Sequence, residues 1–195
     1  MVGHHHRDSS HSMPHNEDRS PPPSNLLSPD GKFLDQASQQ VQEMIEAGAS
    51  RCEILTRLAT AAEILAGPGS VVSILVLNED GVLRNGASPN LPVDYLTAID
   101  RLKPDAKVGT CAAAAATGLV VITPDLRADD KWAELRHLPL ALGFLGAWSV
   151  PIKAPSGKVL GTFGTYFRER RSPTPDERKG VELLAQAAAL ALATC

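Results

Sequence analysis

Three cysteines, Cys52, Cys111 and Cys195, carry the most reactive side chains of this 195-residue sequence. Their number is odd and none of them lies in the short spacing of a zinc-binding or disulfide motif, so we expect reduced thiols in a cytoplasmic protein. A catalytic thiol needs a neighbour that lowers its pKa and a second cysteine that resolves the product. No such partner is apparent for Cys111, and we interpret it as a buried, unreactive residue.

The segment Gly109-Thr110-Cys111 directly precedes an alanine-rich stretch that starts at Ala112 and ends at Gly118. This composition predicts a short helix over 111–117, since glycine commonly terminates a helix. The free N–H groups and the positive dipole end at such a helix start suit an anion or a carbonyl group. The alternative is that Thr110 only caps the helix. The sequence leaves both interpretations open.

Histidines are concentrated at the start of the chain, with five of the six at His4, His5, His6, His11 and His15. Residues 1–31 are also rich in Ser, Pro, Asp and Arg and poor in large apolar side chains, which predicts a disordered tail. The histidines indicate either a metal-binding tract or an expression tag, and we prefer the tag. Residues 32–195 are expected to form one domain, without a metal site.

The overall composition is typical of a soluble protein. Lys and Arg number 19 against 22 Asp and Glu, and the net charge of -3 argues against a binder of nucleic acid or of anionic membranes. The longest apolar stretch, 183–193, is shorter than the roughly 20 residues that cross a bilayer. The polar N-terminus shows no signal peptide, and we expect no membrane contact.

Hydrophobic periodicity predicts two helices at the start of the domain and one, capped at Thr174, at its end. Between them, β-branched runs and turn residues predict two hairpins separated by an irregular region with short helices. The expected strands cover 71–77, 82–87, 119–122, 147–152 and 159–167, and the expected helices cover 33–48, 54–67, 90–102, 111–117, 131–142 and 174–195. This order predicts an α+β fold with a central antiparallel sheet of five or six strands and the long terminal helices on one face.

The last predicted helix is apolar on nearly every face between Val181 and Leu192, with Gln186 as the exception. A helix that is apolar all round must be buried on more than one side. One side is expected to pack on the sheet, and the other to meet a partner helix. We therefore expect a homodimer formed through the N- and C-terminal helices.

Six segments, in the same order, resemble the motifs of the GAF domain family: 73–81, 86–95, 108–114, 122–132, 143–152 and 157–177. Gly109-Thr110-Cys111 resembles the family's Gly-Ser-Cys-Gly segment, and residues 148–152 resemble its Trp-Ser-x-Pro-Ile strand. The resemblance covers residues 45–193 and is to the type found in bacterial sensor kinases and diguanylate cyclase-associated proteins. Where the family has glycine after the cysteine, this chain has Ala112, which implies an ordinary helix start and a slightly smaller pocket.

The resemblance implies a ligand pocket, because GAF domains hold their ligand between the sheet and the short middle helices, on the face away from the long ones. Trp148 either forms a wall of this pocket or fills the core. Asp125 either contacts the ligand or caps a loop. Tyr95 either presents its hydroxyl to a ligand or only packs in the core. Trp132 is expected only to pack beneath Asp125. The candidate ligand-binding residues are Gly109, Thr110, Cys111, Ala112, Tyr95, Asp125, Trp148 and Ser149.

The resemblance further implies a regulatory, non-catalytic domain that senses a small molecule, with no cofactor. Its terminal helices are expected to shift between two arrangements and to report the ligand to a histidine kinase or a cyclic-di-nucleotide enzyme. The sequence names neither the ligand nor the effector. The chain is expected to be either a fragment of a larger sensor or a single-domain regulator.

Other activities of GAF domains remain as alternatives. A free methionine sulfoxide reductase would use Cys111, but residues 131–147 contain no cysteine to act as its nucleophile. A covalent bilin is not expected, because Glu134 and Leu135 stand where its cysteine would be. Haem would depend on His137, the single histidine of the domain. Cyclic-nucleotide binding and a pure dimerisation module, its pocket filled by side chains, are also left open.

Overall fold

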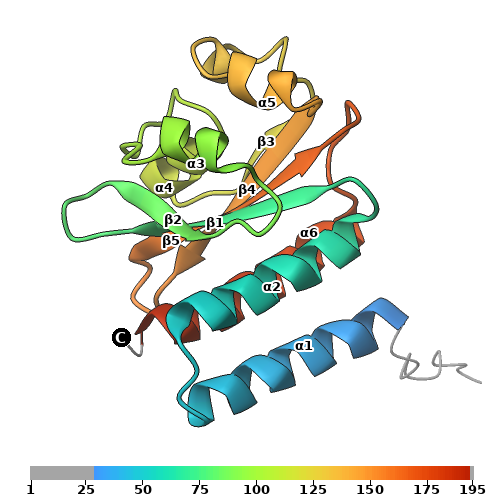
Figure 1. The fold of residues 1–195 in the computed structure, drawn as a ribbon, viewed down its shortest axis with the longest axis vertical. Helices are drawn as coiled ribbons and strands as arrows, with labels where there is room; N and C mark the ends of the chain where they lie inside the picture. Colours follow the sequence, from blue (N-terminus) through green and yellow to red (C-terminus); the bar gives the residue numbers. More distant parts are fainter. Residues whose placement is uncertain (1–28, 194–195) are drawn as a thin grey trace, which may run out of the picture.

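The computed structural model describes residues 29–193. Its elements in chain order, shown in Figure 1, are α1 (Pro29–Glu46), α2 (Arg51–Ala66), β1 (Val71–Leu77), β2 (Leu83–Ala87), α3 (Val93–Ile99), α4 (Cys111–Thr117), β3 (Val121–Thr123), the 3₁₀ helix η1 (Asp130–Trp132), α5 (His137–Ala141), β4 (Gly146–Lys153), β5 (Val159–Phe167) and α6 (Pro175–Ala193). The first helix begins before the predicted domain boundary at residue 32. The rest of the predicted tail, with its histidines, lies outside the described residues.

The five strands form one antiparallel sheet in the order β2-β1-β5-β4-β3, which confirms the predicted α+β fold. Strand β5 lies at the centre, paired with β1 on one side and β4 on the other. Successive side chains of a strand point to opposite faces. Phe163 and Phe167 therefore join the core beneath the long helices, whereas Tyr166 joins a second core on the other face.

The long helices cover one face of the sheet. Helices α2 and α6 lie against the strands, and α1 lies on the far side of these two helices (Figure 1). Helix α2 begins with a capping box: the Glu53 N–H donates to Ser50 Oγ at 3.2 Å, and the Ser50 N–H donates to Glu53 Oε2 at 2.8 Å. Among residues 29–193, no helix is long and apolar enough to span a membrane.

The apolar character of α6 has an explanation within the chain itself. Helix α6 packs on β4 and β5 on one side and against α1 and α2 on others, so the sheet and two helices of the same chain cover much of it. Gly180 allows α6 to approach α2 closely, since a Cβ at this position would clash with the Leu65 side chain of α2. The all-round apolarity of α6 therefore does not by itself require a partner molecule, and the expected homodimer stays a prediction. The exposed large apolar side chains of α6 are Leu183 and Leu190.

The opposite face of the sheet carries the short elements α3, α4, η1 and α5 (Figure 1). We expected residues 131–142 to be helical with a break at Pro139, but the break comes earlier, because the chain forms η1, then a turn, then α5 with Pro139 inside it. The helix predicted over 90–102 is shorter, since Arg101 adopts a positive φ of 62° and the Leu83 N–H donates to the Leu102 carbonyl at 2.8 Å. This layer and the sheet enclose the second core.

Candidate functional site

A chain of thiol and hydroxyl groups lies between α4 and the sheet. Cys111 Sγ lies 3.0 Å from Ser149 Oγ, and Ser149 Oγ donates to Thr110 Oγ1 at 2.9 Å. A hydroxyl has a single proton, so Ser149 has none left for the sulfur and the Cys111 S–H must be the donor between them. All three residues are buried. They form a neutral hydrogen-bonded chain that ties α4 to β4.

Gly164 of β5 gives the Cys111 thiol its place on the sheet. Gly164 is paired with Ser149 on β4 and with Ser73 on β1. A Cβ at Gly164 would lie 2.8 Å from Cys111 Sγ and 3.3 Å from Ser149 Oγ. Any larger side chain would therefore push α4 away from the strands. The glycine is required for close approach and not for a turn.

The environment of Cys111 disfavours a reactive thiolate. Its side chain is 7% exposed, and burial raises the pKa of the thiol, with the hydrogen bond to Ser149 opposing this only in part. The thiolate is the nucleophilic form of cysteine. Cys52, the other cysteine within residues 29–193, is exposed on α2, across the sheet from Cys111. The described part of the chain thus offers Cys111 no neighbouring thiol for a redox cycle.

Two tyrosines join the layer of short helices to the sheet. Tyr95 Oη of α3 donates to Tyr166 Oη of β5 at 2.6 Å, and the two rings meet edge to face with centroids 5.8 Å apart. Trp132 and Phe144 pack around Tyr166 with centroids at 6.3 and 5.5 Å. Burial raises the pKa of both tyrosines, so both hydroxyls are neutral at physiological pH. This aromatic cluster occupies most of the space in which we expected a ligand pocket.

What remains is a cavity of about 20 Å³. Its size is close to the 10–15 Å³ or so that one water molecule requires. The expectation of an open hollow is therefore wrong for this conformation, because Tyr95, Tyr166 and Trp132 fill the space above the alanine-rich helix. The lining residues are Leu75, Tyr95, Ile99, Leu102, Gly109, Thr110, Cys111, Ala112, Trp132, Leu135, Leu138 and Tyr166.

The lining contains no charged side chain. The anion that we expected at the start of α4 thus finds no Lys, Arg or His in the cavity. Thr110 also does not cap α4, since its side chain makes no capping hydrogen bond and instead accepts from Ser149. The site is apolar with a few neutral hydrogen-bonding groups, a lining typical of small-molecule pockets.

Most of the predicted site residues lie at the cavity, whereas two of them lie elsewhere in the fold. The cavity contains Gly109, Thr110, Cys111, Ala112 and Tyr95, with Ser149 beneath them. The prediction that Trp148 and Asp125 line the pocket does not agree with the structure.

Trp148 points to the opposite face of β4 from Ser149 and packs in the core under α6, 1% exposed. Asp125 accepts from the Arg127 N–H at 3.0 Å and closes a turn, and its carboxylate lies 3.8 Å from Arg170. Both residues thus take the structural roles that we gave as alternatives.

Sequence reasoning missed Trp132 as a cavity residue. We expected it only to pack beneath Asp125, yet its indole lines the cavity, 4% exposed, and its buried Nε1 has no hydrogen-bond partner. The available signal was the recurrence of Trp132, Leu135 and Leu138 at a spacing of three in a segment that is otherwise mostly polar. The 3₁₀ turn that aims it inward begins with Asp129, whose carboxylate accepts from the Lys131 N–H at 3.0 Å.

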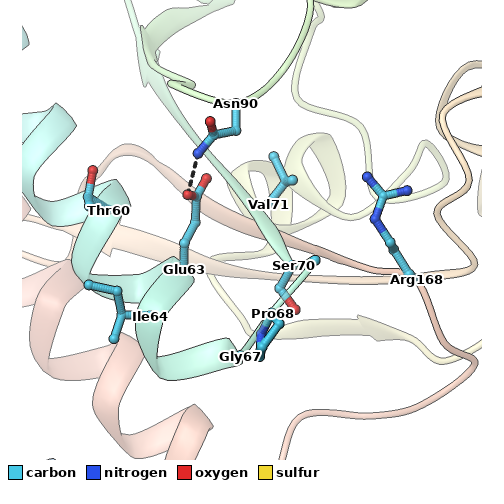
Figure 2. A pocket seen from close by; sticks show the side chains of 10 residues that line it. Thr60, Glu63, Ile64, Gly67, Pro68, Ser70, Val71, Asn90 and Arg168 are labelled. Atoms are coloured by element: carbon cyan, nitrogen blue, oxygen red, sulfur yellow. Dashed lines mark hydrogen bonds between the residues drawn. The ribbon is translucent and has the colours of Figure 1, made fainter.

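A larger pocket, about 600 Å³, lies open on the surface between α2 and β1. Figure 2 shows Glu63 and Asn90 joined by a hydrogen bond on one side of it, with Arg168 apart from them. Glu63 also accepts from the Val72 N–H at 3.1 Å, and Arg168 donates to the Leu142 carbonyl at 2.9 Å. Since Glu63 and Arg168 already form hydrogen bonds within the protein, we interpret this pocket as a surface groove where structural elements meet and not as a ligand site. Residues 29–193 contain no cluster of His, Cys, Asp or Glu fit for a metal ion.

Comparison with known proteins gives a consistent result. The sequence profile of the GAF domain family matches residues 48–193. A relative from Methanosarcina acetivorans, described as a methyl sulfide methyltransferase-associated sensor, is 33% identical over 157 residues, covering 80% of this chain and 16% of the relative. This chain therefore spans a small part of that protein's length.

Solved structures share the fold at lower identity. The GAF domain from a phosphoenolpyruvate-protein phosphotransferase of Coxiella burnetii aligns with a TM-score of 0.67 and 17% identity, covering 86% of this chain and 96% of that one. The reduced form of fRMsr of Staphylococcus aureus aligns with a TM-score of 0.64 and 12% identity, covering 85% and 96%. Likeness at this identity shows the fold and not the activity.

Proposed function

The chain belongs to the GAF domain family, and we propose that it is a non-catalytic sensory domain whose cavity between α3, α4 and η1 binds a small molecule. The observation that carries this proposal is the cavity itself. Its lining has no charged side chain and consists of apolar side chains together with a few buried hydrogen-bonding groups. The sensor-named relative supports a sensory role. A ligand larger than a water must displace part of the aromatic cluster, so binding and conformational change are coupled.

The sheet offers a short path from the cavity to the long helices. Ser149 and Tyr166 lie on the cavity side of the sheet, while the adjacent residue in each strand, Trp148 or Phe167, faces the layer of α1, α2 and α6. A displacement of Tyr166 by a ligand moves β5 and hence the packing beneath α6. We propose that this shift is relayed to an effector, a histidine kinase or a cyclic-di-nucleotide enzyme, in a longer protein.

Self-association is a further part of the proposal. Leu183 and Leu190 lie two turns apart on α6 and are 40% and 60% exposed. Residues seven apart share one helix face. We propose that this face of α6, beside α1, forms the contact of a homodimer.

The thiol reductase is not favoured. Its chemistry needs an accessible thiolate, whereas burial holds the Cys111 pKa above its ordinary value and the described part of the chain offers no nearby second thiol. The fold shared with fRMsr does not alter this, since function resides in the site and not in the fold.

A thermal-shift screen of small metabolites tests the sensory function. A true ligand raises the unfolding temperature in a saturable way, because it binds only the folded state. Leu138→Trp fills the cavity from its half-buried rim and is expected to abolish this shift. Leu119→Trp, at an exposed position outside the cavity lining, is the matched control and keeps it. The function is refuted if no compound stabilises the protein, or if stabilisation persists in Leu138→Trp.

A further inference from the structure

The indole N–H of Trp132 is a buried donor with no partner. The side chain is 4% exposed and Nε1 makes no hydrogen bond within the protein. Leaving a buried donor unpaired costs about 1–3 kcal/mol. Buried polar groups are therefore nearly always bonded, and an exception calls for a specific explanation.

The nitrogen-bearing edge of this indole lies beside Gly109, and both residues line the cavity. A Cβ on Gly109 would lie 3.6 Å from Trp132 Cζ2 and 3.8 Å from Cε2, the ring atom bonded to Nε1. Gly109 itself lines the cavity and adopts a positive φ of 56°. Because Gly109 has no side chain of its own, only its backbone lies against this edge of the ring from that side. Trp132 and Gly109 are held together by the bond from the Gly109 N–H to the Lys131 carbonyl at 2.7 Å.

The other groups around the cavity are neutral. Tyr166 Oη accepts from Tyr95 and keeps its own proton to donate, and the Cys111 S–H is engaged with Ser149. An ion placed among these residues loses its hydration without gaining an opposite charge, which is costly in an apolar interior. A neutral molecule with an acceptor atom meets no such penalty and satisfies the free donor.

We propose that this cavity takes a small uncharged ligand with a hydrogen-bond acceptor, and that the Trp132 indole N–H is the donor that recognises it. The inference rests on the proposed sensory function and narrows it to a class of ligand. Apolar walls from Leu75, Ile99 and Leu138 fit the remainder of the molecule. Because the cavity is small, the Tyr95 side of the wall moves outward when such a ligand enters.

Three probes of nearly equal size separate charge from hydrogen bonding: acetophenone, benzoate and isopropylbenzene. The readout is the pair of indole N–H signals of the ¹⁵N-labelled full chain at pH 7. Trp148 is an internal control, because its Nε1 is also buried and unpartnered but lies on the other face of the sheet. Trp132→Phe and Trp148→Phe assign the two signals.

Acetophenone is expected to shift the Trp132 signal saturably and leave the Trp148 signal in place. Isopropylbenzene, which lacks the acceptor, is expected to bind about tenfold more weakly, the effect of one well-formed hydrogen bond. Benzoate is expected to give no saturable shift. In thermal-shift titrations, Trp132→Phe is expected to remove the preference for acetophenone over isopropylbenzene while keeping the affinity for the latter.

The proposal is overturned if acetophenone leaves the Trp132 signal unmoved, if benzoate binds as well as acetophenone, or if all three probes bind alike. Should Trp132→Phe not fold, the comparison of the three probes on the unmodified chain still decides. A charged metabolite whose stabilisation is lost in Leu138→Trp would refute this ligand class while leaving the sensory function intact. The two hypotheses can therefore fail separately.

Discussion

Tyr95 of α3 and Tyr166 of β5 share a hydrogen bond of 2.6 Å between their buried hydroxyls, although they lie 71 positions apart in the chain. This bond joins the outer layer of short helices to the central strand. The same strand carries Phe167 on the face covered by the long helices. The tyrosine pair thus connects α3, in the layer that covers the cavity, to the central strand of the domain.

Removing either hydroxyl is expected to destabilise the fold. Tyr95→Phe takes away the donor and should lower the free energy of unfolding by about 1 kcal/mol, the usual net worth of such a bond. Tyr166→Phe should have a similar cost. The double variant should cost little more than one single variant, because the two hydroxyls contribute through each other. Urea unfolding of the three variants measures this, and a strictly additive double variant would contradict the coupling.

The contact between Gly164 and Cys111 predicts a rescue experiment. Gly164→Ala places a methyl group 2.8 Å from Cys111 Sγ and is expected to cost about 1–3 kcal/mol of stability through overpacking. Cys111→Ala removes the sulfur and should recover much of that loss in the double variant. Gly157→Ala is a useful comparison, since its Cβ would meet open space and its cost arises from a positive φ of 89° alone. Absence of any rescue by Cys111→Ala would show that the clash lies elsewhere.

Stability is expected to fall at alkaline pH. Burial raises the pKa of the Cys111 thiol in the folded state above its unfolded value. The folded chain then holds its proton at pH values where the unfolded chain has lost it, so this contribution is complete below about pH 8.5 and declines above it. The buried tyrosines add a second decline above about pH 10, since their pKa values are also raised.

The thiol part of this decline can be isolated. Cys111→Ala should flatten the loss of stability between pH 8.5 and 10 and leave the steeper loss above pH 10. Cys52→Ala, at an exposed thiol on α2, is the matched control and should leave the profile unchanged. Urea unfolding at a series of pH values provides the measurement. An identical profile for Cys111→Ala and the unmodified chain would show that the thiol does not control it.

The exposed face of α6 predicts the oligomeric state. If Leu183 and Leu190 meet their copies across a two-fold axis, Leu183→Glu with Leu190→Glu should weaken association by tenfold or more, on the order of what burial of one leucine contributes. Lys158→Glu, at an exposed position in the turn between β4 and β5, controls for the change in charge. Analytical ultracentrifugation compares the masses, and circular dichroism checks that the fold is retained. A monomeric unmodified chain, or a double variant that still dimerises, would rule out this interface.

Much of the fold was predictable because local patterns specify it. The β-branched run over β1 and the turn after it identify a hairpin in the sequence, and the structure pairs β1 with β2 in this way. Capping is less certain from sequence: Thr174 accepts from the Glu177 N–H at 3.1 Å as predicted, but the Glu177 carboxylate pairs with Arg171. Thr174 and Glu177 have the spacing of a capping box, in which the Glu177 carboxylate would accept from the Thr174 N–H. The ion pair with Arg171, a residue outside the helix, engages that carboxylate instead, and sequence spacing does not reveal such competition.

The site was less predictable, because it depends on which face each side chain takes. Neighbouring residues Trp148 and Ser149 were both assigned to the cavity, yet a strand sends them to opposite faces. Trp132 was assigned to packing, and the direction of its N–H edge depends on a 3₁₀ turn. The all-round apolarity of α6 had indicated a partner molecule, but α1 and α2 of the same chain cover much of this helix.

The amino-acid sequence by itself determined the order of elements, the antiparallel sheet and the family, since these follow from periodicity, turn residues and motif order. Only the tertiary structure decided that the expected hollow is nearly closed by Tyr95, Tyr166 and Trp132. The volume of a cavity is the small difference between an enclosed space and the side chains packed into it. Residues far apart in the chain set both quantities, so no local pattern contains the answer.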